Sequence, residues 1–394
     1  MTNQRTKNIN NDRVSSISEM FSPNNIMKPL KNTYIGGADH IITLCVILLV
    51  MFGVIMVFSS SYYTSSRGNG DMFEYLKKEL VFASIGFVAM AIGSRIPHRN
   101  WARFTKILYI VSCLLLVLVI LIGKEVNGAK RWIEIGGFSF QPSEIAKVST
   151  ILSLSTLLAN NKNLLETPRG LLIYVITFLI PCGLVAVENL STAIVIGLIG
   201  CAMLFVYTPK LSYFIPVVIA GVLGIILMIL FSGFRSNRIQ AWIDPFSNTS
   251  ETGWQVVQSL YSIASGGAFG LGLGGSRQKL GYMPEAHNDI IFAIVCEELG
   301  WVGAAIVVTI FMVLIWRGVL VAIRHTENPF SMLMATGITS MIAAQVIINI
   351  AVVTNTIPNT GIPLPFISYG GTSMVILLFS MGVLLNISKY KKSV

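Results

Sequence analysis

Ten apolar segments dominate this chain, and most have the length of an α-helix that crosses the hydrocarbon core of a bilayer, roughly 20 residues. They cover residues 40–60, 80–96, 105–123, 142–159, 171–187, 190–206, 211–231, 290–316, 331–354 and 368–388. None alternates polar and apolar side chains as the strands of a membrane β-barrel do. Only 12% of the 394 residues are charged, against roughly 25% in a soluble domain. The sequence therefore predicts an all-α polytopic integral membrane protein.

The number of spans depends on the fifth and sixth segments, which are separated only by Glu188 and Asn189. A single helix over both would far exceed the bilayer core of roughly 30 Å. Cytoplasmic loops carry an excess of Lys and Arg, which tests the two alternatives. With ten spans and both termini inside, 17 of the 28 Lys and Arg are cytoplasmic, 10 are exterior and Lys147 lies in a span. Merging the two segments would put the C-terminal lysines outside, so we predict ten transmembrane helices.

This topology divides the chain into three parts. Residues 1–39 are polar and are predicted to form a disordered cytoplasmic tail, residues 40–388 form the membrane domain, and residues 389–394 form a basic cytoplasmic C-terminus. Part of the net charge of +10 thus reflects membrane topology, and no nucleic acid is expected as a partner. The five cysteines lie in or beside apolar segments without a CxxC pair, which argues against a disulfide framework or a zinc site.

Three exterior loops carry the informative residues. The loop 124–141 leads into Glu144 and Lys147, whose i,i+3 spacing puts both on one helix face, where they can neutralise each other or meet a ligand. The loop 232–289, between the seventh and eighth helices, is the longest and contains Arg235 and Arg238. Loops of this length are usually functional or disordered, and residues 254–261 are predicted to form amphipathic helical turns on the membrane surface. Three prolines stiffen the last loop, 354–368.

A polar cluster stands where the long loop meets the eighth helix: Glu285, His287, Asn288 and Asp289. Charged groups at the edge of a membrane are costly, which favours a role in binding or catalysis. Asn288 or Asp289 could equally be an ordinary helix N-cap. The preceding cations Arg277 and Lys279 could bind phosphate or simply lie beside anionic headgroups. Glu297 and Glu298 could bind metal or substrate, or form interhelical contacts.

Four glycines precede this cluster, at positions 270, 272, 274 and 275. Their pattern is not the dinucleotide-binding fingerprint and lacks its strand–turn–helix context. Two roles remain open for them: a loop whose N–H groups cradle phosphate, or a close approach of the backbone to lipid or to a neighbouring helix.

Three motifs in these loops resemble those of one family. They are NGAKRWIEIGGFSFQPSEIAK (127–147), SGGAFGLGLGGSRQKLGYMPEAHNDIIFAIVCEELG (265–300) and GIPLPFISYGGTSM (361–374). The chain resembles the shape, elongation, division and sporulation (SEDS) peptidoglycan glycosyltransferases FtsW, RodA and SpoVE over nearly all residues after the tail. The forms PEAHND and PLPFISYGG are closer to the FtsW and SpoVE branch than to RodA.

The resemblance implies a ten-helix fold in the bacterial cytoplasmic membrane and the polymerisation of lipid II into glycan strands at its outer face. The family's catalytic aspartate corresponds to Asp289, which would act as general base. Because Asp289 precedes a helix, we expect the positive end of the helix dipole to favour its ionised form. The other residues expected to bind substrate are Lys279, Arg277, Arg131, His287, Glu285, Glu144 and Lys147, with Lys130 beside Arg131.

Among these residues, Lys279, Arg277 and Arg131 are predicted to meet phosphate, and Glu144 and Lys147 to match the family's polar pair in the membrane cavity. His287 could orient Asp289, although a hydrogen bond within the loop is the favoured alternative. The resemblance also implies a divalent cation, Mg or Mn, with unknown ligands, and a class B penicillin-binding protein as partner, with other division proteins. We expect a role in septal synthesis during cell division, with elongation and sporulation as alternatives.

One position departs from the family pattern. Relatives have a proline and an aspartate before Leu-Gly-Thr, whereas this chain has Glu188, Asn189, Leu190, Ser191 and Thr192. Glu188 could replace the missing charge from one position away. Two other functions stay open: a lipid II flippase, with which a polar pair inside the membrane is compatible, and an ion-coupled transporter. A transporter would favour charged residues at mid-membrane and inverted repeats, neither of which is evident.

Overall fold

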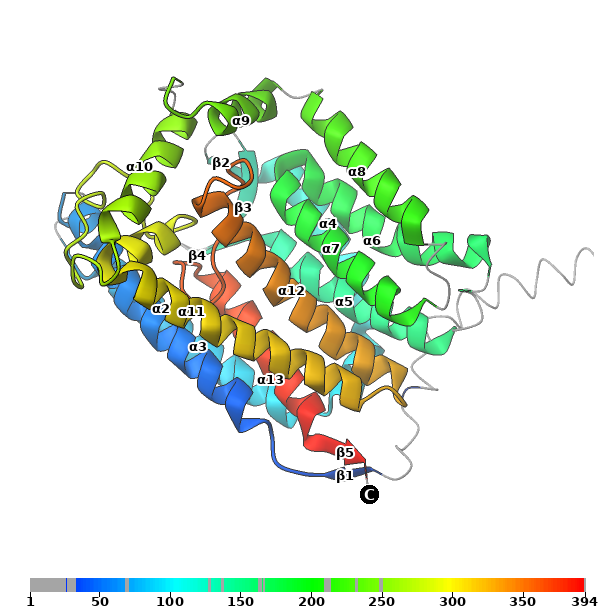
Figure 1. The fold of residues 1–394 in the computed structure, drawn as a ribbon. Helices are drawn as coiled ribbons and strands as arrows, with labels where there is room; N and C mark the ends of the chain where they lie inside the picture. The colour runs from blue at the N-terminus through cyan, green and yellow to red at the C-terminus, as the bar shows by residue number, and fades with distance from the viewer. Residues whose placement is uncertain are drawn as a thin grey trace, which may run out of the picture.

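The computed structural model describes residues 26, 33–67, 71–126, 129–135, 138–161, 165, 167–208, 214–230, 233–247 and 251–392. Its helices form one bundle (Figure 1). The helices are α2 (His40–Arg67), α3 (Glu74–Arg95), η1 (His98–Phe104), α4 (Thr105–Ile122), α5 (Pro142–Asn160), α6 (Pro168–Glu188), α7 (Leu190–Tyr207), α8 (Phe214–Leu230), α9 (Gly233–Ile243), α10 (Glu251–Gly266), α11 (Ile291–Arg324), α12 (Pro329–Val353) and α13 (Thr372–Lys389). The strands are β1 (Thr33–Ile35), β2 (Lys124–Val126), β3 (Ala129–Ile135), β4 (Phe138–Phe140) and β5 (Tyr390–Lys392).

Each of the ten predicted spans falls on a helix: α2 to α8 and α11 to α13. Within the described residues, 7 helical stretches are long and apolar enough to cross a membrane, corresponding to α2, η1 with α4, α6, α7, α11, α12 and α13. The chain is therefore a multi-pass membrane protein. Helices α3, α5 and α8 do not meet the same criterion, because α3 and α5 carry charged or hydroxyl side chains and α8 has only 17 residues. The count of ten spans stays a prediction.

Helix α5 runs through the middle of the bundle, which accounts for its polar composition. Its hydroxyl groups pair with those of α4: Ser149 contacts Ser112 at 2.7 Å between their Oγ atoms, and Thr156 contacts Thr105 at 2.9 Å. Nearly all of its residues are buried against α4, α6, α7 and α12. A central helix can therefore carry polar groups that a lipid-facing helix cannot.

The break between the fifth and sixth segments is confirmed. Helix α6 ends at Glu188 and α7 begins at Leu190. The side chain of Asn189 accepts a hydrogen bond from the backbone N–H of Thr192 at 3.1 Å and so caps α7. The two helices pack against each other as separate elements.

Part of the predicted disordered tail is ordered. Strand β1 pairs with β5 in an antiparallel ladder in which Ile35 lies opposite Tyr390. Asp39 then accepts hydrogen bonds from the N–H groups of Ile41 and Ile42 and forms an ion pair with Arg317 of α11. The boundary at residue 39 was therefore too late, and the C-terminal segment also contributes a strand. Residues 1–25 and 27–32 lie outside the described residues.

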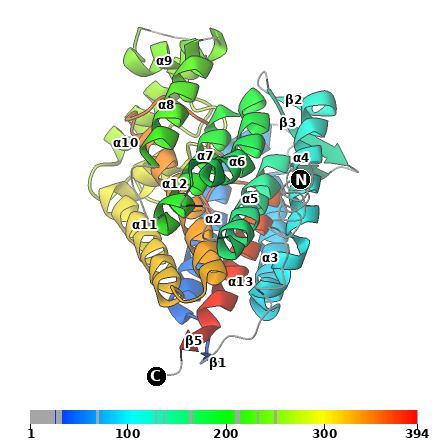
Figure 2. The same ribbon diagram turned by 90° about the vertical axis from the view of Figure 1, so that its right-hand side faces the viewer.

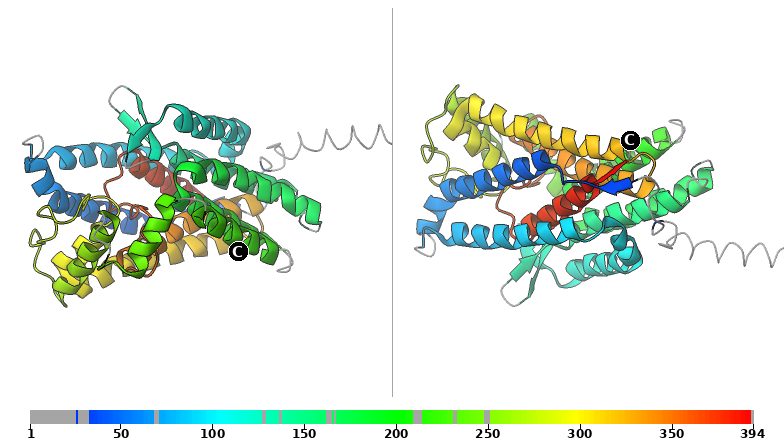
Figure 3. Two further views of the ribbon diagram at one scale, coloured as in Figure 1. Left: turned by 90° about the horizontal axis from the view of Figure 1, so that it is seen from above. Right: turned by 90° about the horizontal axis from the view of Figure 1, so that it is seen from below.

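The two ends of the bundle differ. Strands β1 and β5 lie at one end, and helices α9 and α10 lie at the other (Figure 2). Seen from above and below, α11 runs beside α2, and α13 beside α3 (Figure 3). The long loop therefore contains two helices, and α10 includes the predicted amphipathic turns at 254–261. Their placement on a membrane surface stays a prediction.

The glycine-rich segment packs backbone to backbone against a kink in α11 at Gly300, whose φ is 64°. The N–H groups of Leu271 and Gly272 donate to the carbonyl oxygens of Glu297 and Glu298, both at 3.0 Å. A Cβ atom at Gly270 would lie 2.2 Å from the carbonyl oxygen of Glu298. Close approach to a helix, rather than a phosphate cradle, therefore explains these glycines.

Candidate active site

Asp289 lies two residues before the start of α11 and is half-buried. Its backbone carbonyl accepts a hydrogen bond from Asn349 Nδ2 of α12 at 2.6 Å. The same nitrogen donates to the carbonyl of Ile362 at 2.8 Å. Asn349 thus joins three elements that are far apart in the sequence: the long loop, α12 and the last exterior loop. Sequence reasoning missed Asn349, because a single amide in a long apolar segment gave no signal.

The last exterior loop passes directly beside the Asp289 carboxylate. A Cβ atom at Gly361 would lie 3.5 Å from Asp289 Oδ2, and the φ of Gly361 is 67°. This loop is held from several sides: Ser191 of α7 donates to the carbonyl of Thr360 at 2.7 Å, and Trp242 of α9 donates to that of Asn355 at 3.0 Å. The carboxylate is therefore bordered by a segment that is fixed in place.

Burial dominates the electrostatics of Asp289. It raises the pKa of Asp289 to about 6, with the nearby charge of Glu285 acting in the same direction. The charges of Arg238 and Arg131 act against this rise. We expected the helix dipole to favour the ionised form, and the direction of the pKa shift contradicts this, because loss of solvent outweighs the helix end. A carboxylate with a pKa near the working pH is suited to accept a proton.

Two arginines approach Asp289 from different elements. Arg131, on β3, donates from Nε to the carbonyl of Glu188 at 3.3 Å, and Arg238, on α9, donates from Nη1 to the carbonyl of Asn359 at 3.2 Å. Arg131 was predicted as a substrate-binding residue. Arg238 was noted only as a charge of the long loop, because its sequence position does not reveal that α9 turns back toward Asp289.

Lys279 has a structural partner. It is 5% exposed, and its Nζ lies 2.7 Å from Glu298 Oε1 and 3.0 Å from Ser59 Oγ of α2. Ser59 Oγ in turn donates to Glu298 at 2.8 Å. This buried cluster ties the long loop to α11 and α2 and accounts for the charge of Lys279, so the structure gives no support to its predicted phosphate role.

Arg277 and Glu297 complete this attachment. Glu297 accepts from the hydroxyl of Ser276 at 2.6 Å and from the backbone N–H of Arg277 at 2.9 Å. Of the alternatives for Glu297 and Glu298, the structure therefore supports contacts within the protein. The side chain of Arg277 is exposed, and its phosphate role stays a prediction.

His287 packs between two tyrosine rings and holds the loop by its backbone. Its ring centroid lies 4.4 Å from that of Tyr75 and 5.8 Å from that of Tyr369, and its carbonyl accepts from the N–H of Tyr369 at 3.0 Å. Burial lowers the pKa of His287 to about 4, so the ring is neutral at pH 7. Its Nδ1 has no hydrogen-bond partner among the described residues. These contacts fit a role within the loop rather than orientation of Asp289.

Glu285 lies at the exposed edge of this cluster. Its backbone has a φ of 52°, and its Oε2 accepts from Asn288 Nδ2 at 3.1 Å. Within the described residues, no group of three His, Cys, Asp or Glu side chains could hold a metal ion. Glu285 and Asp289 are close enough to influence each other's charge, which gives a donor set of two carboxylates. Mg²⁺ is commonly held by one or two carboxylates together with substrate phosphates, so this set fits the expected cation only with substrate present.

Glu144 and Lys147 meet each other, as their spacing predicts. Lys147 Nζ lies 2.8 Å from Glu144 Oε1, and the side chains of Lys147 and Glu144 are 1% and 5% exposed, in that order. Ser373 of α13 donates to Glu144 Oε2 at 3.0 Å. Ser373 also lines a pocket of about 260 Å³ beneath the loop 363–370. The pair therefore lies inside the bundle beside a small cavity.

Removing one member of this buried pair should destabilise the protein strongly. We expect Glu144→Gln to lower the free energy of unfolding by about 3–5 kcal/mol, because the Lys147 charge stays buried without a counter-charge. Glu134→Gln is the matched control, because its partner Lys124 is 56% exposed and Glu134 itself 51% exposed, and exposed pairs contribute about 1 kcal/mol or less. Thermal unfolding in detergent measures both. Equal midpoints for the two variants would contradict the buried ion pair.

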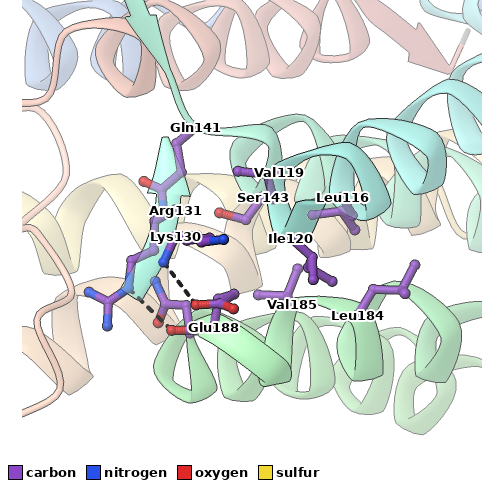
Figure 4. A pocket seen from close by; sticks show the side chains of 11 residues that line it. Leu116, Val119, Ile120, Lys130, Arg131, Gln141, Ser143, Leu184, Val185 and Glu188 are labelled. Carbon is purple, nitrogen blue, oxygen red and sulfur yellow. Dashed lines mark hydrogen bonds between the residues drawn. The ribbon is translucent and has the colours of Figure 1, made fainter. Parts of the chain in front are cut away.

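Glu188 and Asn189 show how the chain accommodates its departure from the family pattern. Glu188 Oε2 accepts a hydrogen bond from the backbone N–H of Lys130 at 2.8 Å (Figure 4), while Asn189 caps α7. Glu188 thus supplies the negative charge at this point and fixes the β2–β3 hairpin, which carries Arg131.

Known proteins resemble this chain over most of its length. The family model of FtsW, RodA and SpoVE, described as cell cycle protein, matches residues 39–393. The chain is 38% identical to stage V sporulation protein E of Bacillus subtilis over 361 residues, 90% of this chain and 98% of that protein. It is 35% identical over 354 residues to a protein of Trichlorobacter lovleyi named probable peptidoglycan glycosyltransferase FtsW, with coverage of 89% and 93%.

Solved structures share the fold. The chain superimposes on a chain of a peptidoglycan synthase complex, from a study of how that complex coordinates polymerization and crosslinking, with a TM-score of 0.73, 23% identity and coverage of 89% and 97%. The rod shape determining protein RodA of Thermus thermophilus matches with a TM-score of 0.66, 24% identity and coverage of 89% and 96%. At these identities the structural matches establish the fold alone.

Proposed function

We propose, from the fact that this chain belongs to the FtsW, RodA and SpoVE family of cell cycle proteins, that its bundle is a peptidoglycan glycosyltransferase with Asp289 as general base. The resemblance seen in its three motifs is thereby confirmed. Relatives at 35% and 36% identity, covering most of both chains, are named peptidoglycan glycosyltransferases, so the chain is a glycosyltransferase of peptidoglycan synthesis. The observation that supports the role of Asp289 is its carboxylate, half-buried beside two arginines, with a pKa of about 6.

The reaction that we assign uses lipid II as donor and acceptor. The 4-hydroxyl of the acceptor GlcNAc attacks C1 of the terminal MurNAc of the growing chain, and the bond from C1 to the diphosphate oxygen breaks with inversion. The hydroxyl proton passes to the Asp289 carboxylate, and the electron pair of the broken bond leaves with undecaprenyl diphosphate. Because the base must be unprotonated before each turnover, a pKa near 6 keeps most of the enzyme active at pH 7.

The arginines beside Asp289 would stabilise the leaving group. Arg131 and Arg238 both act on the Asp289 carboxylate through their charge. A diphosphate that departs next to them gains charge-assisted hydrogen bonds as its negative charge develops. A divalent cation held by Glu285 and the substrate's diphosphate would supply further neutralisation when bound.

The cellular setting follows from the same family. We propose that the site faces the outer side of the bacterial cytoplasmic membrane, with both termini cytoplasmic. One structural neighbour is a complex described by polymerization and crosslinking, which supports a class B penicillin-binding protein as partner, together with other division proteins. We assign the chain to septal synthesis, and the similarity to a sporulation protein keeps sporulation as the alternative.

Polymerisation should depend on pH through Asp289. Its pKa lies above the ordinary value of 3.8, at about 6, so kcat/KM should be half-maximal near pH 6 and fall about tenfold for each further unit of acidification. Protonation of Asp289 cannot unfold the protein, because a carboxyl whose pKa is raised on folding stabilises the folded state as it gains its proton. Initial rates of glycan formation at low lipid II concentration between pH 5 and 8 measure the profile. A flat profile down to pH 5 would rule out this carboxylate as the base.

A lipid II flippase is the second candidate, because the buried Glu144–Lys147 pair lies within the bundle. The purified chain, with a transpeptidase-inactive penicillin-binding protein, labelled lipid II and a divalent metal, separates the two functions. Glycan polymer supports the glycosyltransferase. Movement of lipid II across a vesicle membrane without polymer would favour the flippase.

A further inference from the structure

A groove of about 270 Å³ lies between α4, α6 and β3 (Figure 4). It is apolar at one end and polar at the other. The apolar side chains are Leu116, Val119, Ile120, Leu184 and Val185, and the polar ones are Lys130, Arg131, Gln141, Ser143, Glu188 and Asn189. Such a groove matches an amphiphile that has a charged head and an apolar chain.

The apolar end adjoins a surface that faces lipid. Leu121 and Ile122, next to the groove on α4, are 68% and 67% exposed, and Val187 on α6 is 55% exposed. In a membrane protein, exposed aliphatic side chains at this density contact lipid chains. An apolar chain can therefore reach the groove from the bilayer.

The polar end has the charge for an anionic head. Lys130 and Arg131 lie at this end, opposite Leu116 and Leu184 (Figure 4). The carboxylate of Glu188 also lines it, but its Oε2 already accepts the N–H of Lys130 at 2.8 Å. Two cations face one carboxylate, so the net charge of this end is positive.

Ser143 gives an independent sign of a polar ligand. Its side chain is 5% exposed and lines the groove, yet its Oγ has no hydrogen-bond partner among the described residues. A buried hydroxyl without a partner is costly and uncommon. A phosphate oxygen at the polar end would supply the missing partner.

We propose that this groove binds the polyprenyl diphosphate carrier, with the first isoprene units against α4 and α6 and the diphosphate at Lys130, Arg131 and Ser143. This inference rests on the proposed function and extends it to the lipid part of the substrate. Arg131 also acts on the carboxylate of Asp289, so a diphosphate bound by it is next to the reacting sugar. A carrier with one chain and two phosphates suits a single groove with two cations better than a phospholipid with two chains and one phosphate.

The test measures the binding of geranylgeranyl diphosphate to the full chain in nanodiscs of phosphatidylcholine. Leu184→Trp fills the apolar end, and we expect it to weaken the affinity at least tenfold. Leu179→Trp is the control, because Leu179 lies on the same helix, is 47% exposed and does not line the groove; its affinity should stay within twofold of wild type. Ser143→Ala removes a hydroxyl that has no partner among the described residues, so it should fold normally and bind severalfold more weakly.

Each outcome supports or overturns binding in the groove. Wild-type affinity in both Leu184→Trp and Ser143→Ala would overturn the proposal. Equal competition by inorganic diphosphate would show that the chain contributes nothing, and equal competition by phosphatidylglycerol would show a general lipid site; either would also overturn it. Asp289→Asn should bind the probe as wild type does. Wild-type chain that binds the probe through the groove but makes no glycan would refute the proposed function and leave the groove standing.

Discussion

Gly270→Ala should unfold or severely destabilise the long loop and the start of α11. The new Cβ would lie 2.2 Å from the carbonyl oxygen of Glu298, a backbone atom that cannot move alone. The φ of Gly270 is 77°, a region that costs an L-residue about 1–2 kcal/mol. Relief of the clash requires the loop to leave α11, which would break the hydrogen bonds from Leu271 and Gly272. We therefore expect a loss of more than about 4 kcal/mol of unfolding free energy.

Gly272→Ala is a matched control for this prediction. Gly272 lies in the same loop and has a φ of 88°, but a Cβ atom there would meet nothing within 4 Å. It should cost only the backbone strain, about 1–2 kcal/mol. Thermal unfolding and the yield of monodisperse protein in detergent measure both variants. If the two alanines destabilise the protein equally, the contact between the loop and α11 does not exist as described.

The consequence for function follows from the same contact. The loop is attached to α11 by backbone hydrogen bonds and by the Lys279–Glu298–Ser59 cluster, and Asp289 lies between this loop and α11. A mild lesion of the attachment should therefore lower activity without touching Asp289, because a shift of about 1 Å at a catalytic group can cost about a hundredfold in rate.

The elements that depend on local sequence were predictable. Apolar segments of membrane-spanning length marked the helices, the i,i+3 spacing of Glu144 and Lys147 put them in contact, and the polar residues Glu188 and Asn189 marked the end of α6 and the cap of α7. Each of these signals acts within a few residues, so no knowledge of tertiary packing was needed.

The contacts that surround Asp289 could not be read in this way. Asn349 is 60 residues away from it along the chain, and Ser59 is 220 residues away from Lys279. Lys279 looked like a free cation because Glu298 meets it only after the loop folds back. The direction of the Asp289 pKa shift failed for the same reason, since burial depends on the loops that cover the helix end. The motif identified the residue, and tertiary structure determined its surroundings.

Asp289→Asn should abolish glycan polymerisation while it leaves lipid II bound. Asparagine keeps the size and the polar character of the side chain but cannot take a proton from the attacking hydroxyl. General base catalysis commonly contributes about 10²–10⁴-fold, and we expect a loss toward the upper end, because the other titratable members of this cluster are poorly placed: Glu285 is at its exposed edge and His287 packs between two tyrosines. The backbone contact from Asn349 to the carbonyl of residue 289 does not depend on the side chain, so the fold should be retained.

The most direct measurement compares two quantities in one preparation of Asp289→Asn with its penicillin-binding protein: the affinity for lipid II and the initial rate of glycan formation. Asp289→Glu serves as a partner variant that keeps the carboxylate. We predict lipid II affinity within about twofold of wild type, glycan formation reduced by about a thousandfold or more in Asp289→Asn, and partial activity in Asp289→Glu. Glycan formation at the wild-type rate in Asp289→Asn, with lipid II bound normally, would contradict the assignment of Asp289 as the base.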